Sequence, residues 1–83
     1  MTRAVVLYGR DGCHLCDDAR VVLQNLQREV PFTLSEIDIE TDDRLFKRYL
    51  ERIPVIALNG EELYDFFVDA EDLASRLRKL AQT

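Results

Sequence analysis

The segment YGRDGCHLCDDAR, from Tyr8 to Arg20, places both cysteines of the chain where a predicted strand passes into a predicted helix. Arg3 to Tyr8 is a short apolar run that ends at Gly9, which is typical of a buried strand. Apolar residues then recur at helical spacing, at Leu15, Ala19, Val22, Leu23 and Leu26. A strand followed at once by a helix is how a βαβ unit begins, so the segment favours an α/β fold.

The remainder of the chain predicts three more strands and two more helices. We expect strands at 32–39, 54–58 and 62–67, a short helix after Thr41-Asp42-Asp43, and a helix at 69–81. Asn59-Gly60 is a strong signal for a two-residue hairpin between the last two strands. The order strand, helix, strand, helix, strand, strand, helix predicts a four-stranded mixed sheet in one domain, residues 1–83, with helices on both faces. The first two strands should be parallel, and the closing hairpin should be antiparallel.

Charge and hydropathy exclude several kinds of partner. The formal net charge of −5 provides no basic stripe to neutralise phosphates, so we expect no nucleic-acid partner. No apolar run approaches the roughly 20 residues that span a bilayer, so we expect no membrane partner. The run from Ala4 to Tyr8 is too short for the core of a signal peptide. These features predict a cytoplasmic protein.

The spacing of Cys13 and Cys16 leaves three interpretations open. In a reducing compartment the pair indicates redox or metal chemistry, and residues three apart on a helix share a face at a separation that suits a disulfide. A structural zinc ion needs four ligands, whereas Cys13, Cys16 and His14 supply at most three, so a metal site would have to be shared between subunits. The third interpretation is two small buried thiols. A structural staple is disfavoured because so short a loop constrains the unfolded chain little.

Within the redox interpretation, the two cysteines have different roles. Free N–H groups and the positive end of the helix dipole favour a thiolate at Cys13, whereas Cys16 lies one turn inside and should be less exposed. This asymmetry predicts Cys13 as the nucleophile and Cys16 as the resolving thiol.

Two other segments have both a structural and a functional interpretation. Pro54 is either an ordinary strand-start proline or the second residue of a cis peptide that lets Ile53 present its backbone N–H and C=O to a substrate beside Cys13. Phe66-Phe67-Val68 is predicted as core and edge strand, with an exposed phenylalanine in a substrate surface as the alternative.

Together these residues resemble a known family. The segment from Tyr8 to Cys16, then Ala19, Leu23, Ile53-Pro54-Val55 and Asn59-Gly60, is similar to the glutaredoxins, above all to short bacterial glutaredoxin-like proteins whose cysteines are separated by His-Leu or a similar dipeptide. The resemblance covers essentially the whole chain. It implies a thioredoxin fold, Cys13 as nucleophile, a cis peptide before Pro54, and Arg10 as a contact for the glycyl carboxylate of glutathione.

The chain also departs from that family. His14-Leu15 replaces the usual Pro-Tyr between the cysteines. Val68-Asp69-Ala70-Glu71-Asp72 stands where glutaredoxins have Gly-Gly and an acidic pair that anchors the γ-glutamyl end of glutathione, and Asp72 is the closer equivalent of that anchor. In structural terms Glu71 and Asp72 simply complement the dipole of the last helix.

The sequence therefore predicts a thiol–disulfide oxidoreductase that reduces protein disulfides or glutathione mixed disulfides. Its predicted site has Cys13 and Cys16 as catalytic residues and Arg10, Ile53, Pro54 and Asp72 as substrate-binding residues. We expect a monomer with no bound cofactor and no metal, and glutathione is the candidate co-substrate. The alternatives are a non-enzymatic binding domain of the same fold, or a metal or iron–sulfur site across a dimer.

Overall fold

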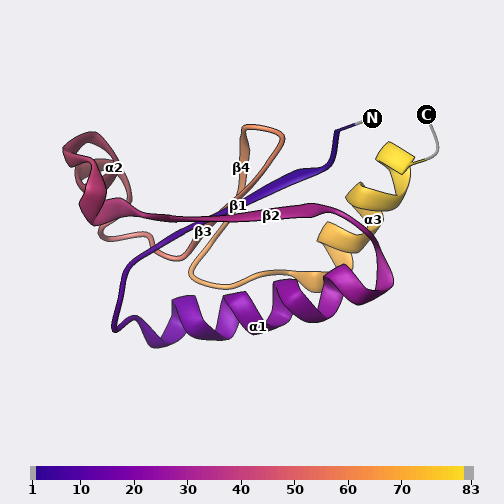
Figure 1. Ribbon diagram of the computed structural model, residues 1–83, viewed down its shortest axis with the longest axis horizontal. Coiled ribbons are helices and arrows are strands. Elements are labelled where there is room, and N and C mark those ends of the chain that lie inside the picture. Colours follow the sequence, from indigo (N-terminus) through magenta and orange to yellow (C-terminus); the bar gives the residue numbers. More distant parts are fainter. Residues whose placement is uncertain (1, 82–83) are drawn as a thin grey trace.

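The elements of the chain follow the predicted order, with one short turn of helix in addition. The computed structural model describes residues 2–81, so positions 1, 82 and 83 of the expected domain lie outside it. The elements are β1 (Ala4–Gly9), α1 (His14–Glu29), β2 (Thr33–Asp38), the 3₁₀ turn η1 (Ile39–Thr41), α2 (Asp43–Tyr49), β3 (Val55–Leu58), β4 (Glu61–Asp65) and α3 (Ala70–Ala81), as Figure 1 shows. No helix among these residues is long and apolar enough to cross a membrane.

The four strands form one mixed sheet in the order β2-β1-β3-β4. β1 pairs in parallel with β2, and β3 runs antiparallel to both of its neighbours. Asn59 and Gly60 both have positive φ, 51° and 88°, as the tight hairpin turn between β3 and β4 requires. The predicted sheet and the predicted hairpin are therefore confirmed.

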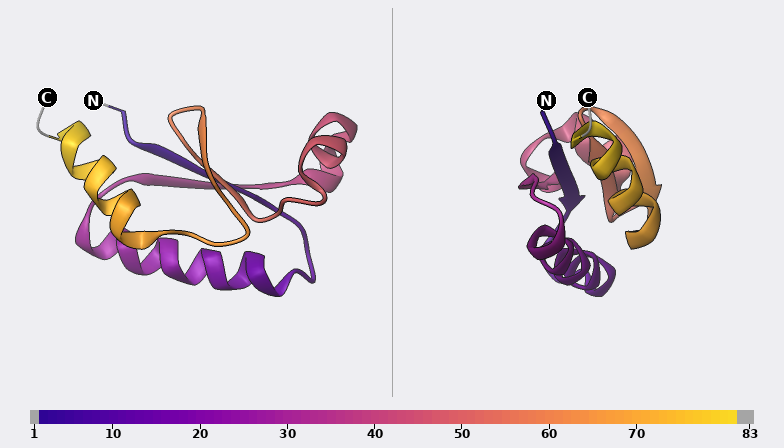
Figure 2. Two further views of the ribbon diagram at one scale, coloured as in Figure 1. Left: turned by 180° about the vertical axis from the view of Figure 1, so that it is seen from behind. Right: turned by 90° about the vertical axis from the view of Figure 1, so that its right-hand side faces the viewer.

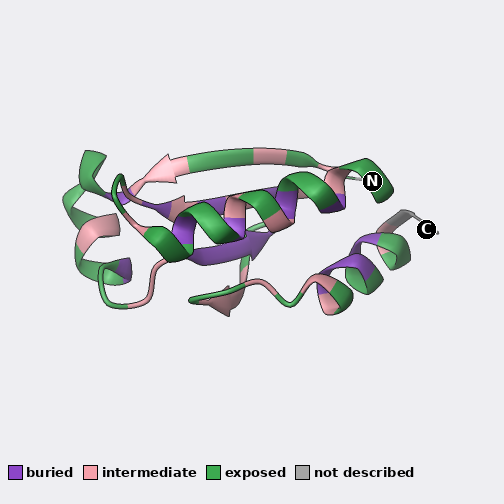
Figure 3. Cartoon of the chain, turned by 90° about the horizontal axis from the view of Figure 1, so that it is seen from below, coloured by how far each residue is buried: buried purple, intermediate pink, exposed green. Residues whose placement is uncertain are grey.

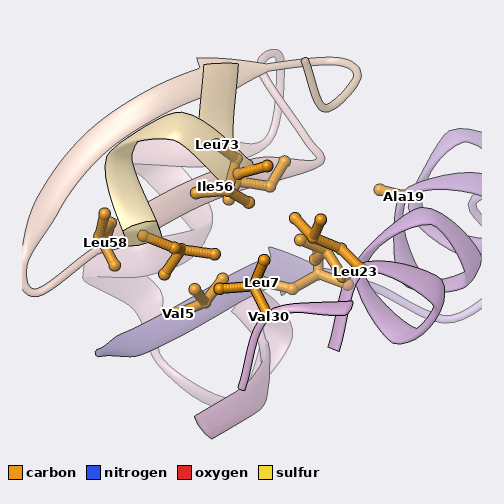
Figure 4. Packing of buried hydrophobic residues seen from close by; sticks show 11 residues of the cluster. Val5, Leu7, Ala19, Leu23, Val30, Ile56, Leu58 and Leu73 are labelled. Atoms are coloured by element: carbon orange, nitrogen blue, oxygen red, sulfur yellow. The ribbon is translucent and has the colours of Figure 1, made fainter. Parts of the chain in front are cut away.

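Helices α1 and α3 pack on one face of this sheet and enclose the main core. Alternate residues of the central strands, such as Leu7 and Ile56, meet Leu23 of α1 and Leu73 of α3 there, as Figure 4 shows. Figure 2 shows both helices on the same side of the strands, and in Figure 3 the central strands are buried while the outer faces of the helices are exposed. The fully buried side chains of the cluster supply most of the hydrophobic stabilisation expected of a domain this small.

A smaller cluster covers the opposite face of the sheet. Ile39 of η1, Tyr49 of α2 and Val55 of β3 are buried together, with Tyr8 packed against them. The rings of Tyr8 and Tyr49 are 4.6 Å apart between centroids. Helices thus lie on both faces of the sheet, as predicted.

Several element bounds differ from the prediction by a residue, and the end of β4 and the turn after β2 differ most. β4 stops at Asp65 rather than Phe67, and Phe66 takes a positive φ of 71°. The additional turn η1 forms because the side chain of Asp38 accepts a hydrogen bond from the Glu40 N–H at 2.8 Å, which caps the chain as it leaves β2.

The core makes a direct prediction about stability. Leu23 is fully buried between α1 and the sheet, so Leu23→Ala leaves a cavity and should lower the free energy of unfolding by about 3 kcal/mol. The matched control is Val21→Ala on the exposed side of the same helix, which should change it by less than about 0.5 kcal/mol. Urea denaturation of both variants tests this, and equal losses would contradict the packing described for α1.

Candidate redox site

The cysteine pair lies where β1 turns into α1. Gly12 takes a φ of 77° in the turn, and Cys13 caps the first turn of α1. The N–H of Cys16 donates a hydrogen bond to the sulfur of Cys13 at 3.2 Å. The Cα atoms of the two cysteines are 5.2 Å apart and their sulfur atoms lie near disulfide distance. The strand, turn and helix therefore bring the two thiols together in a geometry that can close a disulfide.

The two cysteines differ in exposure because of a close contact with β1. Cys16 is buried, with 1% of its surface exposed, whereas Cys13 is partly exposed. A Cβ atom placed on Gly9 would lie 2.9 Å from the sulfur of Cys16, closer than real Cβ contacts occur. The last residue of β1 must therefore be glycine if Cys16 is to pack against it. The predicted difference in exposure between the cysteines is confirmed.

Pro54 lies at the same end of the strands as the cysteine pair. The peptide bond between Ile53 and Pro54 is cis, as the family resemblance implied. Val55 of β3 pairs with Tyr8 of β1. The next residues along the two strands, Pro54 and Gly9, therefore lie side by side, and Cys16 packs against Gly9. Adjacent strands are about 4.8 Å apart, so Pro54 lies about one strand spacing from Gly9, the residue against which Cys16 packs.

An ionic cluster fixes the segment that precedes the cis-proline. Arg52 donates to both carboxylate oxygens of Asp65 at 3.0 Å and to Glu62 at 2.6 Å. Glu62 also accepts hydrogen bonds from Arg48 and from the hydroxyl of Tyr49, each at 2.8 Å. These contacts join the loop after α2 to β4. We call Arg48, Tyr49, Arg52, Glu62 and Asp65 the Arg52 cluster.

The cluster keeps Glu62 ionised far into the acid range. The hydrogen bonds from Arg52, then from Tyr49 and Arg48, lower the pKa of Glu62 to about 2, against partial burial that acts in the opposite direction. For Tyr49, burial and the bond to Glu62 raise the pKa of the hydroxyl. The loop is thus held by charge-assisted bonds that persist throughout the neutral range.

Arg10 lies beside the cysteine pair. A small cavity under the turn is lined by Arg10, Leu7, Gly9, Asp11, Cys16, Arg20, Glu36, Ile37 and Asp38. The guanidinium of Arg10 is 3.5 Å from the carboxylate of Glu40 and 6.0 Å from the ring centroid of Phe46. The predicted Arg10 and Cys16 therefore line the same cavity.

Asp72 is bound by residues that are not part of the cysteine pair. The hydroxyl of Tyr64 donates to its carboxylate at 2.6 Å and Arg76 donates at 2.8 Å, and these two bonds lower the pKa of Asp72. The first turns of α3 share a shallow groove with Leu26 and Glu29 of α1. At 1.5 Å per residue, Leu26 lies roughly 20 Å along α1 from Cys13. The structure does not bring Asp72 to the cysteines, and its predicted role in binding glutathione stays a prediction.

Sequence reasoning missed the Arg52 cluster, and of its two interpretations of Phe66 and Phe67 it favoured the one that the structure contradicts. The members of the cluster come from α2, the following loop and β4, so their contacts depend on the hairpin register rather than on local spacing. Phe66 and Phe67 were expected as core and edge strand, yet they are 44% and 72% exposed. The one available signal was Arg52 itself, a charged residue two positions before a strand-start proline.

The described residues contain no ready metal site. Within 2–81, no group of three or more His, Cys, Asp or Glu side chains is arranged to hold a metal ion. His14, the third candidate ligand, is exposed on the first turn of α1. A metal held by the cysteine pair would therefore need ligands from another molecule.

Comparison with known proteins places this site in a family. Residues 4–78 match the family described as "Glutaredoxin-like domain (DUF836)". The chain belongs to this family. A glutaredoxin-like fold with a Cys-x-x-Cys pair at the start of α1 thus follows from sequence and structure together.

Several solved structures are similar to this chain over most of its length. The solution structure of a protein from Nitrosomonas europaea is 34% identical, with a TM-score of 0.81 and coverage of 93% of each chain. A crystal structure of a protein from X. campestris is also 34% identical, with a TM-score of 0.73 over 90% of this chain and 96% of that one. Thioredoxin 1 from Thermosipho africanus, 15% identical with a TM-score of 0.65 over 96% of this chain and 99% of that one, shows the shared thioredoxin fold.

The contact at Gly9 predicts a specific defect in the cysteine pair. Gly9→Ala should displace Cys16, lower the free energy of unfolding by about 1–3 kcal/mol and slow closure of the Cys13–Cys16 disulfide. The control is Gly12→Ala, which meets no neighbour but strains a left-handed backbone at a cost of roughly 1–2 kcal/mol. Urea denaturation measures the loss of stability in each variant, and the rate of disulfide closure by oxidised glutathione distinguishes the two, because only Gly9→Ala should slow it. Closure at the wild-type rate in Gly9→Ala would contradict the role given to this contact.

The Arg52 cluster predicts a pH-dependent contribution to stability. The folded-state pKa of Glu62, about 2, lies below the roughly 4.3 of an unfolded glutamate, so its contribution is complete above about pH 5 and is lost as the pH falls through 4 towards 2. Glu62→Gln should therefore be less stable than wild type by about 1–2 kcal/mol at pH 7, with the gap closing towards pH 2. Urea denaturation across this range measures it. Exposed Glu61→Gln is the control, and a gap that stays constant down to pH 2 would refute the assignment.

Proposed function

We propose that this glutaredoxin-like protein is a thiol–disulfide oxidoreductase. The observation that carries the proposal is the asymmetry of the pair: a partly exposed Cys13 at the start of α1 and a buried Cys16 behind it, with Cα atoms 5.2 Å apart. The first amides of a helix and its dipole favour negative charge on a thiolate at Cys13. A buried partner within disulfide reach can attack only after Cys13 has formed a bond to substrate.

The reaction proceeds in two exchanges. The Cys13 thiolate attacks one sulfur of a substrate disulfide, forming a mixed disulfide and releasing the other substrate sulfur as a thiolate, which takes up a proton. Cys16 then loses its proton and attacks the sulfur of Cys13, which releases the second substrate thiol. The substrate has gained two electrons and two protons, and the protein holds the Cys13–Cys16 disulfide. An external thiol reductant returns the pair to the reduced state.

The neighbouring residues would position the substrate. Ile53, held before the cis peptide bond, would offer its backbone N–H and C=O groups to an extended substrate, and Pro54 would shape the groove that receives it. Arg10 supplies a cation for a substrate carboxylate, such as the glycyl end of glutathione. Protein disulfides and glutathione mixed disulfides are the substrates we propose, with glutathione as the co-substrate.

Equilibration with mixtures of reduced and oxidised glutathione tests the proposal. Intact-mass analysis should show the wild-type pair converting to an internal disulfide, with a mass loss of about two protons. In Cys16→Ser, the same treatment should leave a single glutathione adduct on Cys13, because no resolving thiol remains. In Cys13→Ser, the buried Cys16 should stay unmodified.

Turnover separates an enzyme from a binding domain that merely retains the fold. With dithiothreitol as reductant, wild type should reduce a protein disulfide such as that of insulin faster than the reagent alone, and Cys13→Ser should not. Wild type that forms its internal disulfide yet gives no rate above Cys13→Ser would favour the binding domain. Purified protein that carries stoichiometric zinc or iron would favour the metal alternative.

A further inference from the structure

The end of β4 presents two exposed aromatic side chains beside the cis-proline. Phe66 is 44% exposed and Phe67 is 72% exposed, and they are the first two residues after the strand ends at Asp65. Only three other large hydrophobic side chains of the described residues are comparably exposed, and one of them is Leu15, between the two cysteines. Burying a large aromatic side chain is favourable, so two adjacent exposed ones require a reason.

The backbone holds this pair in an unusual conformation. Phe66 has a φ of 71°, a region that bulky side chains rarely occupy. Its N–H donates to the carbonyl of Pro54 at 2.7 Å, and the N–H of Phe67 donates to the carbonyl of Asp65 at 2.8 Å. Arg52 donates two hydrogen bonds to the Asp65 carboxylate and so fixes Asp65, the residue just before the turn. The chain is therefore turned out of the strand at Phe66 by contacts with the cis-proline segment itself.

Register places the two phenylalanines in the proposed substrate path. Val55 pairs with Tyr8 on one side and with Asp65 on the other, so Gly9, Pro54 and Phe66 follow at one edge of the sheet. Phe66 thus lies about two strand spacings, roughly 10 Å, from the residue against which Cys16 packs. An extended segment lying along the cis-proline, with its cysteine at Cys13, would place a neighbouring side chain at this distance.

We propose that Phe66 and Phe67 determine substrate specificity by binding an apolar side chain next to the cysteine of a protein disulfide. The inference rests on the proposed function and names its preferred substrate class. Glutathione has no apolar side chain to bury against Phe66 and Phe67, so these two residues would not increase its rate. An unfolded or extended protein segment supplies both the apolar side chain and backbone groups for Ile53.

Three chromogenic mixed disulfides test this with the reduced full-length protein. Each joins 2-nitro-5-thiobenzoate to a different thiol: a short peptide with leucine on both sides of its cysteine, the same peptide with serine, or glutathione. The nitrobenzoate is the better leaving group, so attack by Cys13 occurs at the peptide or glutathione sulfur and releases a coloured thiol. The second-order rate constant of that release is measured for each substrate.

Wild type should react about tenfold faster with the leucine peptide than with the serine peptide, the factor expected for burying one aliphatic side chain against an aromatic pair. Phe67→Ser and Phe66→Gly should both reduce this ratio towards one and leave the glutathione rate within about twofold. Glycine retains the left-handed backbone, so the second variant removes the ring without straining the turn. The control is Val21→Ser, which removes an exposed apolar side chain on α1 and should preserve the ratio.

A ratio near one in wild type, or a ratio that neither phenylalanine variant changes, would overturn the inference while the proposed function stands. A loss of rate with all three substrates in both variants would also overturn it, because that pattern indicates general damage to the site. Failure of wild type to exceed Cys13→Ser with any substrate would refute the proposed function, and the inference with it.

Discussion

The packing of Cys16 against the backbone of Gly9 is the contact on which the site depends. It joins the first turn of α1 to the last residue of β1 at a distance that excludes any side chain at Gly9. Further along α1, Ala19 and Leu23 continue this contact into the main core. These contacts hold the N-terminus of α1 against the end of β1. Cys13 is thereby held at the surface while Cys16 remains inside, which is the difference that the proposed two-step exchange requires.

The opposite side of the site is built by different forces. The loop before Pro54 has only a small hydrophobic cluster beneath it, and charge-assisted hydrogen bonds from Arg52 to Glu62 and Asp65 fix it to β4. Several bonds that share the same partners order a loop better than isolated surface pairs do. The same contacts place the turn at Phe66 next to the cis-proline. One half of the proposed site is thus supported by packing and the other by a polar network, and both are anchored on neighbouring strands.

The sequence predicted those features that local patterns determine. Apolar periodicity identified α1 and the strands, Asn59-Gly60 located the hairpin, and the passage from the first strand to the first helix placed Cys13 at a helix start. It could not predict where β4 ends, because the turn at Phe66 is set by a hydrogen bond to Pro54 across the sheet. The sequence also could not predict the position of Asp72. That carboxylate is placed by the packing of α3 against the C-terminal half of α1 and by the hydrogen bond from Tyr64. Long-range register, rather than propensity, determines each of these features.

The central claim is that the fold exposes one thiol of the pair and shields the other. The most direct measurement is the rate at which iodoacetamide alkylates each cysteine of the reduced, folded protein at neutral pH, resolved by mass spectrometry of the digested peptides. The structure predicts that Cys13 is modified first and that Cys16 is protected until the protein is unfolded in urea, since only 1% of its surface is exposed. Alkylation of Cys16 as fast as Cys13 in the folded protein would contradict the account.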